Sequence, residues 1–202
     1  FSTTASIFTD FIGFIDTTSL FGASAATSGL IVIDSSTLMP LIPGVDYTVQ
    51  PSVATDASTK PISSYRTRVL IEPLKPLKPS TRYIVVLTRA LRSVDGVNAT
   101  ASDLFRVVRS GTAVSASTEP ILATMSPAQK ATLETLRTQL IRPLVVALSG
   151  MIPEDSMVLA WSFTTQSVNN SLLALEAAAT PRPMGVRSTG ATLNLFNPAF
   201  PN

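Results

Sequence analysis

Residues 66–88 hold two stretches in which apolar side chains recur at every second position, separated by a proline-rich turn. The inward-facing members are Val69, Ile71, Tyr83, Val85 and Leu87. A period of two with β-branched and aromatic residues predicts two strands, each with one buried face. The turn contains Pro73, Pro76 and Pro79. Because proline cannot donate a hydrogen bond to a sheet, these residues end the first strand and shape the connection to the second.

The same turn carries the pattern of a tyrosine corner. Tyr83 follows it closely, and a tyrosine there can bond to backbone upstream, as at the corner of an immunoglobulin-like sandwich. Residues 41–49 have nearly the same sequence pattern around Tyr47. For this earlier copy an ordinary proline turn explains the pattern equally well. Together the two segments predict a mainly β fold, an Ig-like antiparallel β-sandwich.

Three more strands are predicted in the first quarter of the chain. Residues 5–11 alternate, and Leu30–Ile33 is a short apolar run that indicates a strand buried on both faces. A short strand at 47–49 precedes a Pro-, Ser- and Thr-rich surface loop at 51–64.

Two further strands are predicted in the second half. Phe105–Arg109 reads as an edge strand whose arginines, Arg106 and Arg109, keep it solvated. Met157–Thr165 alternates again, with Leu159, Trp161 and Phe163 on one face. Trp161, the single tryptophan, is expected in the core between the sheets.

Residues 126–148 depart from the β pattern and predict one long inserted helix. Ser126 and Gln129 form a capping box around Pro127, which suits the first helical position. The predicted apolar stripe is Leu133, Leu136, Leu140, Leu144 and Leu148. Pro143 should bend or interrupt the helix. This helix could either seal one open side of the sandwich or bind a partner, and we prefer the first interpretation.

A short helix is predicted at 168–179, before Pro181 and Pro183. The expected organisation is an Ig-like domain over 1–180, followed by a linker, or the start of another domain, at 181–202. Because the chain opens on Phe1 without a signal peptide, we interpret it as a fragment or a processed product.

Composition excludes several chemistries. The 202-residue chain is long enough for a core that buries about 70% of its unfolded surface. It contains no cysteine and no histidine, which excludes disulfides, thiolate or imidazole metal sites and a Ser-His-Asp triad. We expect no metal and no cofactor. A net charge of +2 gives no reason to expect nucleic acid as a partner. No apolar run is long enough to predict a membrane span.

Three blocks of sequence together resemble a known family. They are Phe1–Leu20, which includes Phe11-Ile-Gly-Phe-Ile-Asp16; Arg68–Gly96, with Leu77-Lys-Pro-Ser-Thr-Arg-Tyr83; and Leu159-Ala-Trp-Ser-Phe-Thr-Thr-Gln166. With the 126–148 insertion between the second and third blocks, the chain is similar over about residues 1–180 to the N-terminal domain of bacterial virulence-factor lipases. The resemblance implies a secreted or surface-held bacterial protein that hydrolyses carboxylic esters of lipids. The reaction would belong to a C-terminal α/β-hydrolase domain outside this chain, which would be the partner of this one.

No catalytic residue of that family maps onto the chain. The nearest approach to Gly-x-Ser-x-Gly is Gly22-Ala-Ser24-Ala-Ala26, which lacks the final glycine and has no histidine to activate Ser24. Glu154 and Asp155 are neighbours in sequence and do not flank a substrate. Asp95-Gly-Val-Asn98 has a trace of calcium-loop spacing but fits a turn better. We therefore assign no catalytic, cofactor or metal residues to this chain.

Two surface features leave alternatives open. The prolines at a spacing of three match a polyproline II ligand, although the flanking strands favour a rigid corner. Seven arginines gather in one third of the chain: Arg66, Arg68, Arg82, Arg89, Arg92, Arg106 and Arg109. On one shared face they would attract anionic lipid headgroups or a membrane surface. Solvated strand faces that discourage edge pairing are the simpler interpretation, and the one we prefer.

Three functions therefore remain. The first, which we favour, is a non-catalytic accessory domain of a secreted lipase. The second is a stand-alone adhesion or carbohydrate-binding module, which would need an exposed aromatic platform. The third is a spacer in a longer surface protein.

Overall fold

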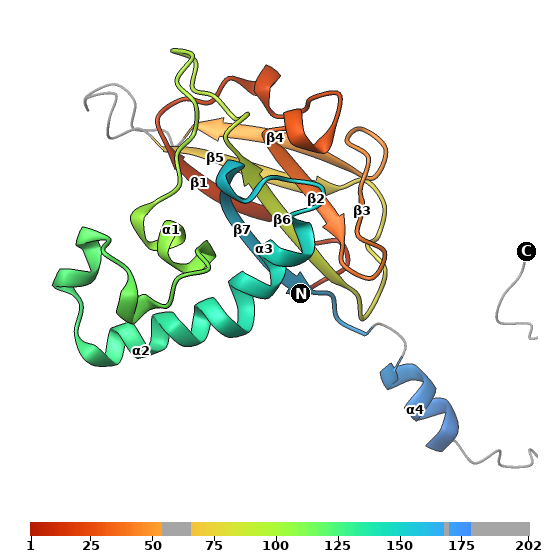
Figure 1. Cartoon of the computed structure of the whole chain (residues 1–202). Helices are drawn as coiled ribbons and strands as arrows, with labels where there is room; N and C mark the ends of the chain where they lie inside the picture. Colours follow the sequence, from red (N-terminus) through yellow and green to blue (C-terminus); the bar gives the residue numbers. More distant parts are fainter. Residues whose placement is uncertain (54–65, 168–169, 179–202) are drawn as a thin grey trace, which may run out of the picture. The chain divides into compact units, whose positions relative to one another are not determined.

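The described residues form seven strands in two sheets, in a computed structural model that describes residues 1–53, 66–167 and 170–178 (Figure 1). The three-stranded sheet has the order β1 (Ile7–Ile12), β5 (Arg66–Pro73), β4 (Tyr47–Val53). The four-stranded sheet has the order β3 (Met39–Pro40), β2 (Leu30–Asp34), β6 (Arg82–Thr88), β7 (Met157–Thr164). All pairings between these strands are antiparallel. The prediction of a mainly β chain built from antiparallel sheets is confirmed.

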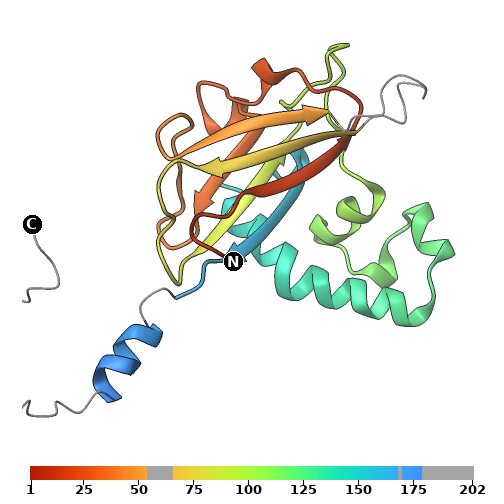
Figure 2. The same cartoon turned by 180° about the vertical axis from the view of Figure 1, so that it is seen from behind.

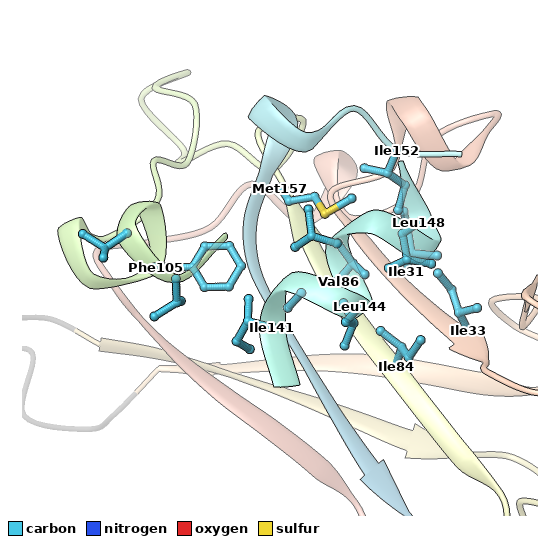
Figure 3. Packing of buried hydrophobic residues seen from close by; sticks show 14 of the residues in the cluster. Ile31, Ile33, Ile84, Val86, Phe105, Ile141, Leu144, Leu148, Ile152 and Met157 are labelled. Carbon is cyan, nitrogen blue, oxygen red and sulfur yellow. The ribbon is translucent and has the colours of Figure 1, made fainter. Parts of the chain in front are cut away.

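Two apolar cores lie on opposite faces of the four-stranded sheet. The inter-sheet core separates it from the three-stranded sheet, which stands in front of it in Figure 2. Its buried members are Ile7, Leu20, Leu30, Val32, Tyr47, Val69, Ile71, Leu77, Tyr83, Val85, Leu87, Leu91 and Val158. The helix-side core fills the other face, where helical residues such as Phe105, Leu144 and Leu148 pack on strand residues such as Ile31 and Val86 (Figure 3). The sheet is therefore covered on both sides.

β6 is the strand that joins the two cores. Val85 faces the inter-sheet core and Val86 faces the helix-side core, and both are 0% exposed. Fully burying a side chain of this size contributes about 1.5–3 kcal/mol. β6 also pairs with β2 on one side and β7 on the other. The stretch with the clearest alternation in the sequence is therefore the centre of the four-stranded sheet.

The proline turn between β5 and β6 is a tyrosine corner, as predicted. The Tyr83 hydroxyl accepts a hydrogen bond from the Lys78 backbone N–H at 3.0 Å. The Thr165 hydroxyl donates to the Lys78 carbonyl at 2.6 Å, and the Lys78 ammonium pairs with the buried Asp34 at 2.9 Å. The prolines thus lie in a corner that is held in place by Asp34, at the end of β2, and by Thr165, the residue after β7. At the earlier copy, the turn closes through a bond of 2.7 Å from the Gly44 N–H to the Tyr47 carbonyl.

Most predicted strands are present with shifted ends. The predicted strand 5–11 is β1, and the strand predicted at 47–49 extends to Val53. The predicted loop 51–64 therefore begins in β4, and its residues 54–65 lie outside the described residues. In β7, Val158 joins the inter-sheet core while Met157 and Ala160 join the helix-side core. A strict period of two would place Val158 and Ala160 on the same face of β7. A β-bulge-like irregularity in the pairing with Leu87 and Thr88 places them on opposite faces instead. Trp161 is only half-buried against the inter-sheet core.

The prediction of an edge strand at Phe105–Arg109 is wrong. This segment is the helix α1 (Asp103–Arg109), which begins where the Ser102 hydroxyl accepts a bond from the Phe105 N–H at 3.2 Å. Phe105 and Val108 lie one turn apart and enter the helix-side core. A short apolar run does not distinguish a strand from a buried helix, and contact with this core decided it.

The predicted helix 126–148 consists of three consecutive helical segments. They are α2 (Pro127–Leu136), a π-helical segment at Arg137–Ile141, and α3 (Arg142–Leu148). The predicted capping box is present, with the Gln129 side chain accepting from the Ser126 N–H at 2.8 Å. Pro143 has no N–H to donate, and the π segment widens the helix just before it. Leu136, a member of the predicted stripe, is 40% exposed.

The remaining helical elements are short. Single 3₁₀ turns occupy Thr17–Ser19, Ala25–Thr27, Val114–Ala116, Pro120–Thr124 and Glu154–Ser156. The helix predicted at 168–179 is α4 (Asn170–Ala178), which belongs to a unit separate from residues 1–167 and is described by itself. The predicted linker 181–202 lies outside the described residues.

An ion pair between the buried Arg137 and the partly exposed Glu134 ties α2 to the loop after α1. Arg137, which is 8% exposed, bonds Glu134 at 2.6 Å and the Ser110 carbonyl at 3.3 Å. Glu134 also accepts a bond from the Val114 N–H at 2.9 Å. The Arg137 guanidinium first, and then this N–H, lower the pKa of Glu134 from 4.5 to about 2, against the opposing effect of burial. Glu134 is therefore charged in the folded protein at any ordinary pH.

We expect Tyr83→Phe to lower the free energy of unfolding by about 1–2 kcal/mol, because the Lys78 N–H then lacks its acceptor while the ring still packs. Urea unfolding measures the loss, and hydrogen exchange at Lys78 locates it. Tyr83→Leu, which also removes the ring, should cost more. Unchanged exchange at the Lys78 amide in Tyr83→Phe would show that the hydroxyl does not hold the corner.

We expect the Glu134–Arg137 pair to make stability depend on pH. Since the folded pKa of Glu134 lies below its unfolded value, the stabilisation is complete above about pH 4.5 and is lost as the pH falls toward about 2. Glu134→Gln should destabilise the protein near pH 7 by on the order of 1–2 kcal/mol. Urea unfolding at a series of pH values should show the difference between variant and wild type shrinking in acid. A difference that stays constant with pH would contradict this assignment.

Candidate functional site

A pocket of about 500 Å³ opens at the edge of the inter-sheet core, between β1, the end of β6, the start of β7 and the segment 91–102. Its apolar walls come from Phe11, Ile12, Phe14, Ile15, Leu87, Leu91, Val97, Ala99, Val158 and Leu159. Its polar lining comes from Thr9, Asp10, Arg92, Ser93, Asn98, Thr100 and Ser102. A concave, mainly apolar pocket with a few polar groups has the form and size of a small-molecule site.

Local hydrogen bonds build the outer wall of this pocket. After β1 the chain turns at Gly13, where φ is +91°, and the Gly13 carbonyl accepts a bond from the Thr67 hydroxyl at 2.6 Å. The next residues pair with the segment after β6, because the Val94 N–H donates to the Phe14 carbonyl at 3.1 Å. The Asp16 N–H likewise donates to the Arg92 carbonyl at 2.9 Å. Two segments far apart in sequence thus form one wall.

The segment 91–99 is a hairpin, and its turn contains Asp95-Gly96, as predicted. The Ser93 N–H donates to the Val97 carbonyl at 2.9 Å, and the Ala99 N–H donates to the Leu91 carbonyl at 2.8 Å. Gly96 has φ +79°, which a glycine adopts without strain. Within the described part of the chain, no three Asp or Glu side chains gather in a way that could hold a metal ion.

The mouth of the pocket is apolar and exposed. Two residues that line it, Ile12 and Val97, are 77% and 64% exposed, and Val94, which follows the lining residue Ser93, is 61% exposed. This mouth was not predicted, because Asp95-Gly-Val-Asn98 was interpreted as a turn and the first predicted strand ends at residue 11, before Ile12. Two valines in and beside a turn were the available clue, since a turn needs no apolar side chains.

A smaller pocket of about 210 Å³ adjoins the first. It is lined by Arg89, Thr100, Ala101, Arg106, Arg109 and Asp155. Thr100 lines both pockets, and the next two residues, Ala101 and Ser102, line one each. The Asn98 side chain, which belongs to the large pocket, donates to the Arg89 carbonyl at 2.8 Å. The segment 98–102 therefore forms the boundary between an apolar and a cationic pocket.

The three arginines of the small pocket differ in their partners. Arg106 bonds Glu119 and Asp103, each at 2.9 Å. Arg109 donates to the backbone carbonyls of Asp155 and Met157. Burial lowers the pKa of the Arg109 guanidinium; Glu154 and Asp155 oppose this, and the charges of Arg89 and Arg106 add to it. Among the described residues, neither Arg89 nor Arg109 lies within ion-pair distance of a carboxylate.

Three other arginines have partners outside the small pocket. Arg68 pairs with Asp10 at 2.8 Å, and Arg92 with Asp16 at 3.5 Å. Arg82, at the far end of β6, bonds the Ser162 hydroxyl at 2.7 Å. A single basic face was the alternative that we did not prefer, and what the structure shows is that Arg89, Arg106 and Arg109 converge on one pocket. Primary sequence offers no signal for this, because Arg89 follows a strand while Arg106 and Arg109 belong to a helix.

The remaining sequence candidates have structural roles. Ser24 lies at the start of a 3₁₀ turn, with its hydroxyl 3.1 Å from that of Thr27, and is exposed. Glu154 pairs with Arg142 at 2.5 Å, whereas Asp155 lines the cationic pocket. No helix in the described ranges has the length and apolar character needed to cross a membrane.

Comparison with known families assigns the chain to a class of bacterial domains. The family model described as bacterial virulence factor lipase N-terminal matches residues 1–195 of the 202. The chain belongs to this family, as its three sequence blocks suggested. A search of curated proteins finds no match.

Proposed function

We propose that this chain is the non-catalytic accessory domain of a secreted or surface-held bacterial lipase, whose reaction is carried out by a hydrolase domain C-terminal to it. The observation that carries the proposal is the family match over residues 1–195. The sequence supports it, because a chain without histidine or cysteine offers neither the usual base nor a thiol nucleophile for ester hydrolysis. Its part in lipid degradation would be to support that domain or to orient it toward lipid.

The fold we assign to this accessory domain is an Ig-like sandwich over 1–180 with a helical insertion at 126–148. The tyrosine corner at Tyr83 and the two facing sheets support that assignment. Residues 181–202 would lead into the hydrolase domain.

Exposed apolar residues support a role in contact. Met39 is 65%, Ile42 is 57% and Leu74 is 53% exposed, on segments joined by the Leu74 N–H to Asp46 carbonyl bond of 2.9 Å. Apolar groups gathered on a surface commonly mark contact with protein or membrane. We assign this surface to the hydrolase domain of the same protein.

The carbohydrate-binding alternative has less support. Phe1 packs on Phe163, Phe21 lies beside Tyr47, and Arg68 stacks over Phe8 at 4.6 Å. Phe1, Phe8 and Phe21 are the exposed rings among these, whereas Tyr47 is buried. Each exposed ring has a different neighbour, so the three do not stack into the flat platform that sugar rings need.

The proposal is tested by an ester-hydrolysis assay of the purified chain and by reading the parent gene downstream of it. The purified chain should not hydrolyse p-nitrophenyl esters above the uncatalysed rate, and Ser24→Ala should behave like wild type. The coding sequence downstream should contain Gly-x-Ser-x-Gly followed by Asp and His. Turnover that Ser24→Ala abolishes would overturn the non-catalytic role, and further Ig-like repeats downstream would favour a spacer.

The proposed contact surface predicts a complex. The chain, added to the separately expressed hydrolase domain, should bind it in analytical ultracentrifugation, and Ile42→Asp should weaken binding by about tenfold or more. Val146→Asp, at a position that is 53% exposed on α3, is the control and should bind normally. Equal binding by both variants would exclude the assigned surface.

A further inference from the structure

We propose that the apolar pocket and the adjoining arginine pocket together form a binding site for one single-chain lipid with an anionic headgroup. The acyl chain would occupy the pocket between β1, β7 and the 91–99 hairpin, and the headgroup would lie against Arg89 and Arg109. Binding here would not require the hydrolase domain, so it goes beyond the accessory role.

The large pocket has the chemistry of an acyl-chain site. Its deep residues Leu87, Leu91 and Val158 belong to the inter-sheet core, so a ligand entering here adds to an existing apolar surface. Its volume of about 500 Å³ falls in the usual range of ligand sites, roughly 300–1,000 Å³. Each buried methylene contributes about 0.8 kcal/mol, which is close to a fourfold change in affinity.

The charged side chains in and near the large pocket are already paired, so they offer little net charge to attract an ion there. Arg92 is paired with Asp16, and Arg68 with Asp10. The charge of a ligand must therefore be met elsewhere, and the cationic pocket beyond Thr100 is the adjoining place.

The small pocket has an excess of positive charge. Arg89 and Arg109 have no carboxylate at ion-pair distance among the described residues, and Asp155 is the one acid that lines the pocket with them. Neighbouring guanidinium groups repel one another, and a bound anion relieves that repulsion. Carboxylate and phosphate oxygens both suit arginine donors, so a fatty acid and a phosphate-bearing lipid share the required chemistry.

The experiment measures binding of three ligands with the same twelve-carbon chain to the full 202-residue chain by isothermal titration calorimetry. Laurate and dodecyl phosphate carry charge, whereas 1-lauroylglycerol is neutral; all are used below micelle formation. Trp161, the single tryptophan, lies on β7 two residues after Leu159 and gives a fluorescence signal as a second readout. We expect one site per chain, with the anionic ligands binding about tenfold or more tightly than the neutral one.

Two variants separate the halves of the site. Arg89→Gln should weaken the anionic ligands by about tenfold and leave 1-lauroylglycerol unchanged. Val97→Glu, at the exposed mouth, should weaken all three. Arg82→Gln is the matched control, since it removes an exposed arginine at the opposite end of β6. Thermal melting checks that each variant is folded, which is expected because all three side chains are exposed.

The outcomes are distinct. Tighter binding of dodecyl phosphate would assign the headgroup to a phospholipid, and tighter binding of laurate would assign it to a free fatty acid. Equal affinity for neutral and anionic ligands, or equal effects of Arg89→Gln and Arg82→Gln, would overturn the headgroup site. No binding of any ligand would overturn the whole proposal. None of these results bears on the accessory role, which the ester assay and the parent gene test separately.

Discussion

The burial of β6 on both faces is the constraint from which the rest of the fold follows. One face needs a second sheet and the other needs helices, because an apolar sheet face left in water would be costly. Val85 and Val86, adjacent in sequence, lie in different cores. The inserted helical stretch at 126–148 therefore provides the layer that this strand requires. A sandwich with one solvated sheet face would not need it.

The same arrangement explains where the pockets are. The two sheets meet along an edge formed by β1 and β7, and neither strand has a further partner strand there among the described residues. The hairpin at 91–99 covers only part of this edge, so the inter-sheet core opens into the large pocket. α1 follows the hairpin directly and brings Arg106 and Arg109 to the base of the same segment. An apolar and a cationic pocket thus adjoin because β6, the hairpin and α1 follow one another in the sequence.

Membership of the lipase N-terminal family gives these features a context. On the proposed function, this domain would work where lipids, and the fatty acids released from them, are plentiful. A lipid site on the accessory domain would keep the enzyme near its substrate or respond to its product. The surface around Met39, Ile42 and Leu74 would then connect this domain to the hydrolase domain, at a different part of the sandwich from the lipid site.

Local sequence determined the parts of this protein that depend on neighbouring residues. The period of two in β5 and β6, the proline corner closed by Tyr83, and the Ser126–Gln129 capping box could all be predicted, because each is fixed by contacts within a few residues. The lack of histidine and cysteine likewise limits the chemistry open to the chain by composition alone. Only the tertiary structure decided that Phe105–Arg109 is a helix, because its short apolar run fits either state and the helix-side core selects one. Only the tertiary structure brought Ile12, Val97 and Leu159 around one pocket and Arg89 beside Arg109, since these contacts join segments whose separation in sequence leaves no local pattern.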